Sequence, residues 1–402
     1  MGDGTGNGSA PEKQVMKGVG RNVAALGVVS FLTDVSSEMI FPILPIFVTT
    51  ILGAGKELLG LIEGIADSIA SLVEIFSGYF SDKMGERKKL VVAGYGLSSL
   101  VKVGIMLSTA WWHVLIMRGL ERVGKGVRTA PRDAMIASSS ESGSRGKAFG
   151  LHRAMDTFGA ITGLVIAFLL LSVYGSTDSG FRTVFLFALV PAFLSVAALL
   201  LLVKEPKKAP LPLKKISFWE SLRQMPPGYM AFLKVSLLFS LSYFSFAFFI
   251  VRAFDLGVAA TSIIELYIIY NIAYAAASIP VGALSDRIGR TPVIGGAFAL
   301  YGLVCIGFVF ASSMLHFALL FIVYGIFVAA DESVNKAYIS DMAKEERRGT
   351  AIGAYNTAIG AAYLPASIVA GMVWAVFGAP AAFTLAAVLA FISAIAFARW
   401  CK

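Results

Sequence analysis

The chain of 402 residues is 57% hydrophobic and only 15% charged, and its formal net charge is +9. A soluble domain of this size carries about a quarter charged residues, so the composition excludes an ordinary water-soluble globular protein and predicts a membrane protein. Two cysteines and three scattered histidines provide neither a disulfide framework nor a zinc site, and we expect no metal and no cofactor.

The first residues are small, polar and rich in glycine, and we expect residues 1–21 to form a disordered cytoplasmic tail. No cleavable signal precedes the first apolar segment, which is therefore expected to remain as an uncleaved anchor. A membrane helix needs about 20 mostly apolar residues. Twelve segments satisfy this requirement: 22–50, 57–80, 90–109, 111–135, 147–172, 181–203, 230–252, 261–284, 292–312, 314–338, 349–376 and 380–400.

The connections between these segments alternate in charge. Lysine and arginine are concentrated near both termini and in every second connection, whereas the opposite set of connections holds only Lys56, Arg182 and Arg252. The positive-inside rule then predicts a multi-pass protein of a prokaryotic inner membrane with both termini in the cytoplasm. Because the basic residues are spread over many short loops, we expect no binding of nucleic acid.

The longest connection, residues 204–229, is basic and rich in proline, and it lies near the middle of the chain. We interpret it as a cytoplasmic linker. It would join an N-terminal bundle of six helices, residues 22–203, to a C-terminal bundle of six helices, residues 230–402. The fold class expected is therefore an all-α membrane protein with twelve transmembrane helices in two bundles.

Two motifs recur at nearly the same spacing. GYFSDKMGERKK begins at Gly78 and GALSDRIGRTP begins at Gly282, 204 residues later, while RGKAFG at Arg145 returns as RGTAIG at Arg348, 203 residues later. A common offset indicates a duplicated half, and internal repeats of membrane spans are typical of secondary transporters. The residues that make up the first motif pair are Gly78, Asp82, Gly85, Arg87, Gly282, Asp286, Arg287, Gly289 and Arg290.

The repeated loop G-x-x-x-D-(K/R)-x-G-x-(R/K) resembles the signature loop of the major facilitator superfamily (MFS). Residues RGLERVGKG from Arg118 are similar to that superfamily's R-x-x-Q-G-x-G-x-G pattern, with Glu121 and Arg122 as departures. The resemblance implies two pseudo-symmetric six-helix bundles around a central cavity and transport by alternating access. It also implies that Asp82 and Asp286 tie helix ends together and control a cytoplasmic gate.

The resemblance extends to bacterial proton-coupled efflux members, with one departure. Such drug exporters carry a proline after the second glycine of a G-x-x-x-G motif in span 5, whereas Leu164 follows Gly159 and Gly163 here. This difference counts against a drug antiporter.

A charged stripe crosses the fourth segment. At about 100° per residue, Arg118, Glu121, Arg122, Lys125 and Arg128 fall on one face of a helix. Charges at mid-depth are costly against lipid, so this face should point to a cavity or to partner charges. For Arg118, Glu121 and Arg122, an ion-paired network between helices and contact with a solute both remain open.

Acidic partners lie in other segments, and the second half is sparser in charge. Asp34 and Glu38 are one turn apart, and in a low dielectric their mutual repulsion favours holding a proton, as a proton carrier requires. His152 and Asp156 form another i, i+4 pair. The residues expected to line a substrate or proton cavity are Asp34, Glu38, Asp67, Arg118, Glu121, Arg122, Lys125, His152 and Asp156.

These features predict a monomeric secondary transporter that moves a small solute with protons through the lipid bilayer, with efflux as the expected direction. A symporter or exchanger of an organic anion or metabolite is the first alternative, because the arginine stripe suits a carboxylate or phosphate. A receptor or scaffold that uses a transporter fold is a second alternative. An enzyme is not expected, because the segments offer no credible nucleophile–base pair.

Overall fold

The computed structural model describes residues 20–84, 86–140, 144–205, 225–343 and 348–401. The predicted tail up to residue 19 and most of the predicted linker, residues 206–224, lie outside the described residues. The first half consists of α2 (Arg21–Ile40), α3 (Leu44–Ile46), η1 (Phe47–Ile51), α4 (Lys56–Met84), α5 (Arg87–Met106), α6 (Trp111–Ser138), α7 (Arg145–Tyr174) and α8 (Asp178–Leu202). The second half consists of α10 (Pro227–Ser240), α11 (Ala247–Asp255), α12 (Ala260–Ile288), α13 (Arg290–Phe310), α14 (Met314–Met342), α15 (Arg348–Phe377) and α16 (Ala379–Trp400).

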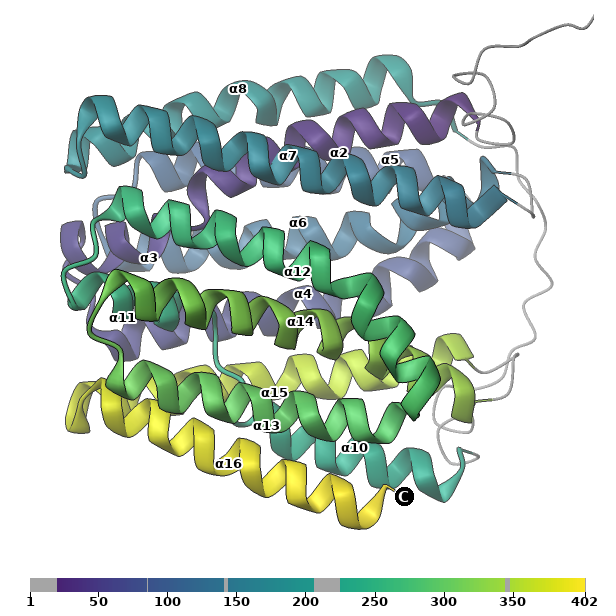
Figure 1. Ribbon diagram of the computed structural model, residues 1–402. Coiled ribbons are helices and arrows are strands. Elements are labelled where there is room, and N and C mark those ends of the chain that lie inside the picture. Colours follow the sequence, from purple (N-terminus) through teal and green to yellow (C-terminus); the bar gives the residue numbers. More distant parts are fainter. Residues whose placement is uncertain (1–19, 85, 141–143, 206–224, 344–347, 402) are drawn as a thin grey trace, which may run out of the picture.

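The helices run side by side along one common direction (Figure 1). If α2, α3 and η1 are taken as one crossing, and α10 and α11 as another, the described helices make the twelve predicted spans. Among the described residues, nine of these spans meet a length and apolarity criterion for crossing a membrane. The spans that miss it are α4 and α6, which hold the charged stripe and its acidic partners, and the divided span α10–α11.

The first and seventh of the predicted spans, 22–50 and 230–252, consist of broken helices. In the first span, α2 ends at Ile40 and a short α-helical turn and a π-helical turn follow, because Pro42 lacks the N–H that would continue the helix. In the seventh span, the chain leaves the helix between Ser240 and Ala247.

Side chains satisfy the backbone exposed by the second break. Tyr301 Oη donates to the carbonyl of Ser242 at 2.9 Å, and the N–H of Ser245 donates to Ser367 Oγ at 3.2 Å. Irregular backbone at membrane depth is tolerated where the protein itself pairs the freed polar groups.

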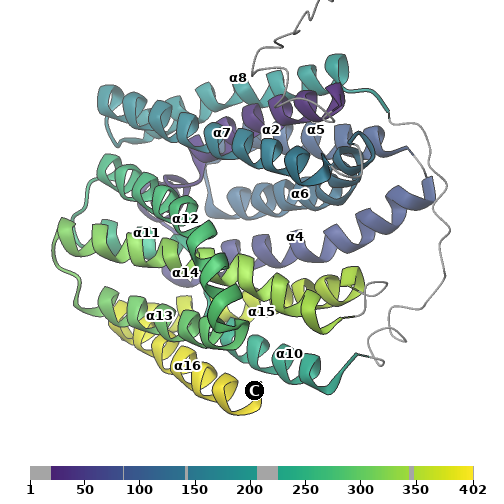
Figure 2. The ribbon, with the colours of Figure 1, turned by 45° about the vertical axis from the view of Figure 1, so that its right-hand side comes forward.

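The two halves meet along three pairs of helices. α4 packs along α15, α7 contacts α12, and α3 contacts α11, and Figure 2 shows α4 at the edge of the first half, next to α15 of the second. Where α3 and α11 meet, Lys56 Nζ forms an ion pair with Asp255 at 3.0 Å. The first residue of α2 and the C-terminus lie at the opposite end of the molecule (Figure 1).

Small residues bring α4 and α15 close together. A Cβ added at Gly60 would lie 2.2 Å from the carbonyl oxygen of Ser367, and one added at Gly371 would lie 2.6 Å from that of Lys56. Ser68 Oγ donates to the carbonyl of Gly360 at 2.6 Å. Small residues at helix contacts are the usual means by which membrane helices approach closely.

Replacing Gly60 with Ala is expected to destabilise the protein, because the new methyl group would push α4 away from α15. Overpacking of this kind costs about 1–3 kcal/mol, and thermal unfolding of the purified protein should show a lower melting temperature. Gly96→Ala is the matched control, because no atom lies within 4 Å of the added Cβ. An unchanged melting temperature for Gly60→Ala would contradict the close packing.

Candidate functional site

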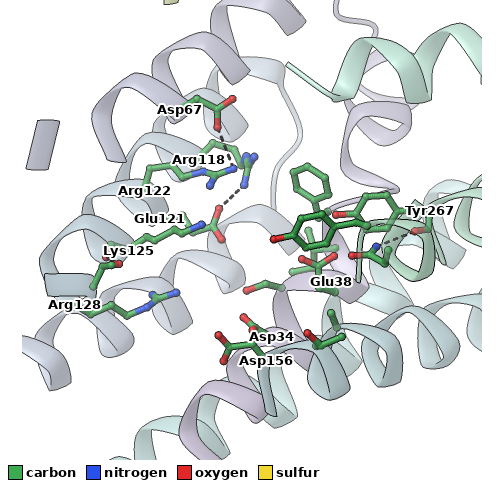
Figure 3. Close-up of a pocket in the computed structure, with 18 of the residues that line it drawn as sticks. Asp34, Glu38, Asp67, Arg118, Glu121, Arg122, Lys125, Arg128, Asp156 and Tyr267 are labelled. Atoms are coloured by element: carbon green, nitrogen blue, oxygen red, sulfur yellow. Dashed lines mark hydrogen bonds and ion pairs between the residues drawn. The ribbon is translucent and has the colours of Figure 1, made fainter. Parts of the chain in front are cut away.

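A cavity of about 560 Å³ lies between the two halves (Figure 3). Side chains from α2, α4, α5, α6 and α7 line it on one side, and side chains from α12 and α14 line it on the other. Of the nine predicted cavity residues, eight line it: Asp34, Glu38, Asp67, Arg118, Glu121, Arg122, Lys125 and Asp156. His152 does not.

Helix α6 lines this cavity with its charged stripe, and two of its glycines allow the neighbouring helices to approach it closely. A Cβ at Gly124 would lie 2.7 Å from Ser98 Oγ of α5, and one at Gly126 would lie 2.8 Å from Val73 Cβ of α4. The packed face of α6 therefore carries glycines at its closest contacts, together with buried side chains such as Met135 and Ile136. The long basic side chains extend from this helix to the cavity, which Lys125 and Arg128 both line.

Arg118 is the centre of a buried cluster of charges. Its Nη2 contacts Glu63 Oε2 at 2.9 Å and its Nη1 contacts Glu121 Oε2 at 2.6 Å. Only 4% of Arg118 and 2% of Glu63 is exposed. Because Arg118 forms ion pairs with two carboxylates at the distance of charge-assisted hydrogen bonds, the cluster holds α6 against α4.

A second, looser contact joins the same two helices. Arg122 Nη2 lies 3.4 Å from Asp67 Oδ1, one turn further along both helices. Both contacts match the ion-paired network that the sequence left open as one of two readings. Solute contact by Arg118, Glu121 and Arg122 stays a prediction.

Besides Arg153 of α7, three further basic side chains at the cavity form no ion pair with the described residues. Arg128 donates to Ser98 Oγ at 2.5 Å, and its guanidinium lies 4.5 Å from the ring centre of Tyr95. Lys102 of α5 donates to the hydroxyls of Ser36 and Ser37 at 2.7 and 3.0 Å. Lys125 has no side-chain partner in the described part of the chain and is exposed to the cavity.

Carboxylates form the wall opposite α6. Asp34 and Glu38 project from α2, and Asp156 projects from α7 beside Asp34 (Figure 3). Glu38 Oε2 is buried without a hydrogen-bond partner in the described residues. His152 lies behind this wall, 4% exposed, with Nδ1 3.4 Å from Asp156 Oδ2.

The second half contributes a mainly aromatic wall, with Glu332 as its one carboxylate among the described lining residues. Tyr267, Tyr270 and Tyr274 follow one face of α12, with successive ring centres 5.4 and 6.4 Å apart. Arg153 of α7 donates to Tyr274 Oη at 2.7 Å, and that hydroxyl donates to Glu332 of α14 at 2.6 Å. This chain of hydrogen bonds connects the two halves beside the cavity.

The repeated loop motif lies away from the cavity. In the second copy, Arg290 contacts Asp286 at 2.6 Å and Asp341 at 3.2 Å, which ties the ends of α12, α13 and α14 together. Gly289 has φ of +94°, in the left-handed region that favours glycine. Gly282 and Arg287 lie on α12.

In the first copy of the motif, Arg87 begins α5 and donates to the carbonyl of Ala134 on α6 at 3.4 Å. Gly78 and Asp82 belong to the last turns of α4. Gly85 lies outside the described residues. The role of both copies in gating stays a prediction.

Sequence comparisons identify relatives over nearly the whole chain. Residues 26–264 and 249–402 match the family model described as Major Facilitator Superfamily. An uncharacterized MFS-type transporter of Methanocaldococcus jannaschii is 41% identical over 381 residues, which cover 93% of this chain and 94% of the relative. The multi-drug resistance efflux pump PmrA of Streptococcus pneumoniae is 30% identical over 175 residues, 42% of this chain and 41% of the pump.

Solved structures share the fold at low sequence identity. The nucleoside transporter NupG superposes with a TM-score of 0.78 at 14% identity, covering 94% of this chain and 99% of that one. A bacterial homologue of the human lysosomal transporter Spinster, inward-facing and occupied, gives 0.76 at 15% identity, covering 98% of both chains. The prediction of an all-helical membrane protein with two six-helix bundles is confirmed.

Replacing Arg118 with Gln is expected to destabilise the protein strongly, because Glu63 and Glu121 would lose their shared cation. Breaking a buried ion pair costs about 3–5 kcal/mol, which thermal unfolding should detect as a lower melting temperature. Adding Glu63→Gln to Arg118→Gln should recover part of the loss.

The control for this change is Lys125→Gln, which removes a basic side chain from the same helix without breaking an ion pair of the described residues. Equal melting temperatures for Arg118→Gln and Lys125→Gln would contradict the structural role of Arg118.

Proposed function

The chain belongs to the major facilitator superfamily, a family of transporters and not of enzymes, and we propose that it moves a small solute across the membrane in exchange for protons. One observation carries the proposal: Asp34, Glu38 and Asp156 face a common cavity between the two halves, and no arginine or lysine of the described residues forms an ion pair with them. A cavity between two bundles suits alternating access, in which the bundles rock around a central site.

The three carboxylates are suited to carrying protons. Like charges held together in a low dielectric are costly, and binding a proton relieves the repulsion. The groups that act on them from the surrounding helices are Lys102 of α5, the basic residues of α6, His152 of α7 and Tyr267 of α12. A proton gained or lost here therefore changes the balance of charge across the cavity.

The proposal includes an orientation of the protein in the inner membrane. The ion pair of Lys56 with Asp255 and the contact of α3 with α11 join the halves at the end opposite the termini. With the termini in the cytoplasm, as the basic loops predict, these contacts would close the external side. The state described would then be closed to the outside.

Export is the direction we propose. Its support is the likeness to the PmrA efflux pump over part of the chain and the resemblance of the sequence to efflux members of the superfamily. A second candidate, symport or exchange of an organic anion, is favoured by a different observation. Lys125 and Arg128 line the cavity and form no ion pair with the described residues, so an acidic solute would find two free cations.

Asp34→Asn is expected to uncouple solute movement from the proton gradient, because the amide cannot carry a proton. The measurement uses proteoliposomes with a trapped pH dye and a solute that stabilises the purified protein against heat. Solute exchange should continue in the variant at higher solute concentration, because Asp156 remains in the cavity, while the solute-driven pH change is lost. Glu265→Gln, an exposed carboxylate of α12 outside the cavity lining, is the control, and an unaltered pH change in Asp34→Asn would exclude Asp34 as the carrier.

Alkaline phosphatase fusions test the orientation, because the enzyme is active only outside the cytoplasm. A fusion to the C-terminus should be inactive and a fusion after Thr177, between α7 and α8, should be active. The reverse pattern would invert the proposed orientation.

A further inference from the structure

Two walls of opposite sign face the cavity. Lys102 of α5 and the residues joined to Tyr274, Arg153 of α7 and Glu332 of α14, also line it and do not follow this division. Once the ion pairs of Arg118 and Arg122 are set aside, α6 presents Lys125 and Arg128, while α2 and α7 present Asp34, Glu38 and Asp156. Figure 3 shows Lys125 and Arg128 on the side of α6 and Asp34 and Asp156 together on the other side.

The two walls do not contact each other through an ion pair in the part of the chain that the structure describes. A ligand that enters between them meets cations on one side and carboxylates on the other.

Neither wall needs the other as its nearest partner. Lys102 is 2% exposed and donates to Ser36 and Ser37, in the helical turn between Asp34 and Glu38, so a cation already stands within the acidic wall. Arg128 is held by Ser98 and by the ring of Tyr95. Side chains of α5 therefore contact both walls, and residues of both walls line the cavity.

The tyrosines of α12 form a third wall of the cavity, which would contact the uncharged part of a ligand. Tyr267, Tyr270 and Tyr274 present stacked rings with polar edges, and an aromatic or flat group packs well on such surfaces. The volume of about 560 Å³ falls in the range of small-molecule sites.

We propose that the cavity binds a zwitterion, a small molecule with an acidic group and an ammonium group on a flat or aromatic body. Lys125 and Arg128 hold the acidic group, Asp34 and Asp156 hold the ammonium group, and the tyrosines of α12 cover the body. A ligand with only one charged group would leave the charges of the opposite wall without a partner.

This inference rests on the proposed function and explains why the solute would be exchanged for protons. The ammonium group and the proton bind the same carboxylates, so each excludes the other. By linkage, a solute and a proton that compete for one site are exchanged across the membrane and not carried together.

The test measures the affinity of the purified full-length protein for two matched sets of ligands at neutral pH. One set is phenylalanine, 2-phenylethylamine and 3-phenylpropionate; the other is tryptophan, tryptamine and indole-3-propionate. Within each set the body is the same and only the charged groups differ. In at least one set the zwitterion should bind about tenfold or more tightly than its amine and its acid. Equal affinity for the acid or the amine alone, or no binding by any of the six compounds, would overturn the proposal.

Two variants assign the walls. In Lys125→Gln the zwitterion should lose its advantage over the amine while the affinity for the amine stays unchanged. In Asp156→Asn it should lose its advantage over the acid while the affinity for the acid stays unchanged. Lys234→Gln, an exposed lysine of α10 outside the cavity lining, should alter neither. Equal losses for all three compounds in both variants would indicate a structural effect and overturn the assignment.

Proton movement separates this inference from the proposed function. A zwitterion that binds and is transported without moving protons would overturn the proton coupling and leave the substrate class standing. Proton-coupled transport of an acid that lacks the ammonium group would overturn the substrate class and leave the coupling standing.

Discussion

The contact of Arg118 with Glu63 and Glu121 is the constraint on which the rest of the site depends. A guanidinium at the middle of a membrane protein is tolerated only when it is paired or faces water, and Arg118 is buried with a carboxylate on either side. The pairing fixes the rotation of α6 against α4. With that rotation fixed, Lys125 and Arg128, two and three turns further along the helix, have to face the cavity.

The second half supplies the aromatic surface of the cavity, which the first half lacks. Its cavity face is a strip of tyrosines, and its contacts with the first half are close packing along α4 and α15, the hydrogen bonds of Tyr274, and the ion pair of Lys56 with Asp255. Charge is therefore concentrated in one bundle while the other provides a flat, hydrogen-bonding surface. Such a division lets one bundle recognise charge while the other moves against it.

Much of the fold could be predicted from the sequence, because each span is a long apolar segment and the loop motif repeats. The proline at 42 signals the break in the first span, whereas the break after Ser240 carries no such signal and depends on Tyr301 and Ser367, which are remote in the sequence. The stripe of α6 was predictable from helical periodicity. The ion-pair partners of this stripe could not be predicted. Glu63 and Asp67 lie on one face of α4, and only the offset between α4 and α6 decides which arginine each of them contacts.

Other parts of the site also could not be predicted from the sequence, because they depend on contacts between different helices. Lys102 is a single charge in an apolar segment, and its partners Ser36 and Ser37 lie on a different helix. His152 and Asp156 are one turn apart and were expected to share the cavity, but a modest rotation of α7 turns Asp156 toward it and leaves His152 behind.

The central claim is that the free charges of the first bundle face a water-filled cavity and not lipid. Thiol labelling tests it most directly, in a protein whose Cys305 and Cys401 have been replaced by Ser and which carries Cys at Lys125 or at Val190, an apolar position 58% exposed in the middle of α8. In inside-out vesicles, a charged, membrane-impermeant methanethiosulfonate should react with Lys125→Cys and not with Val190→Cys. Failure of Lys125→Cys to react would contradict the account.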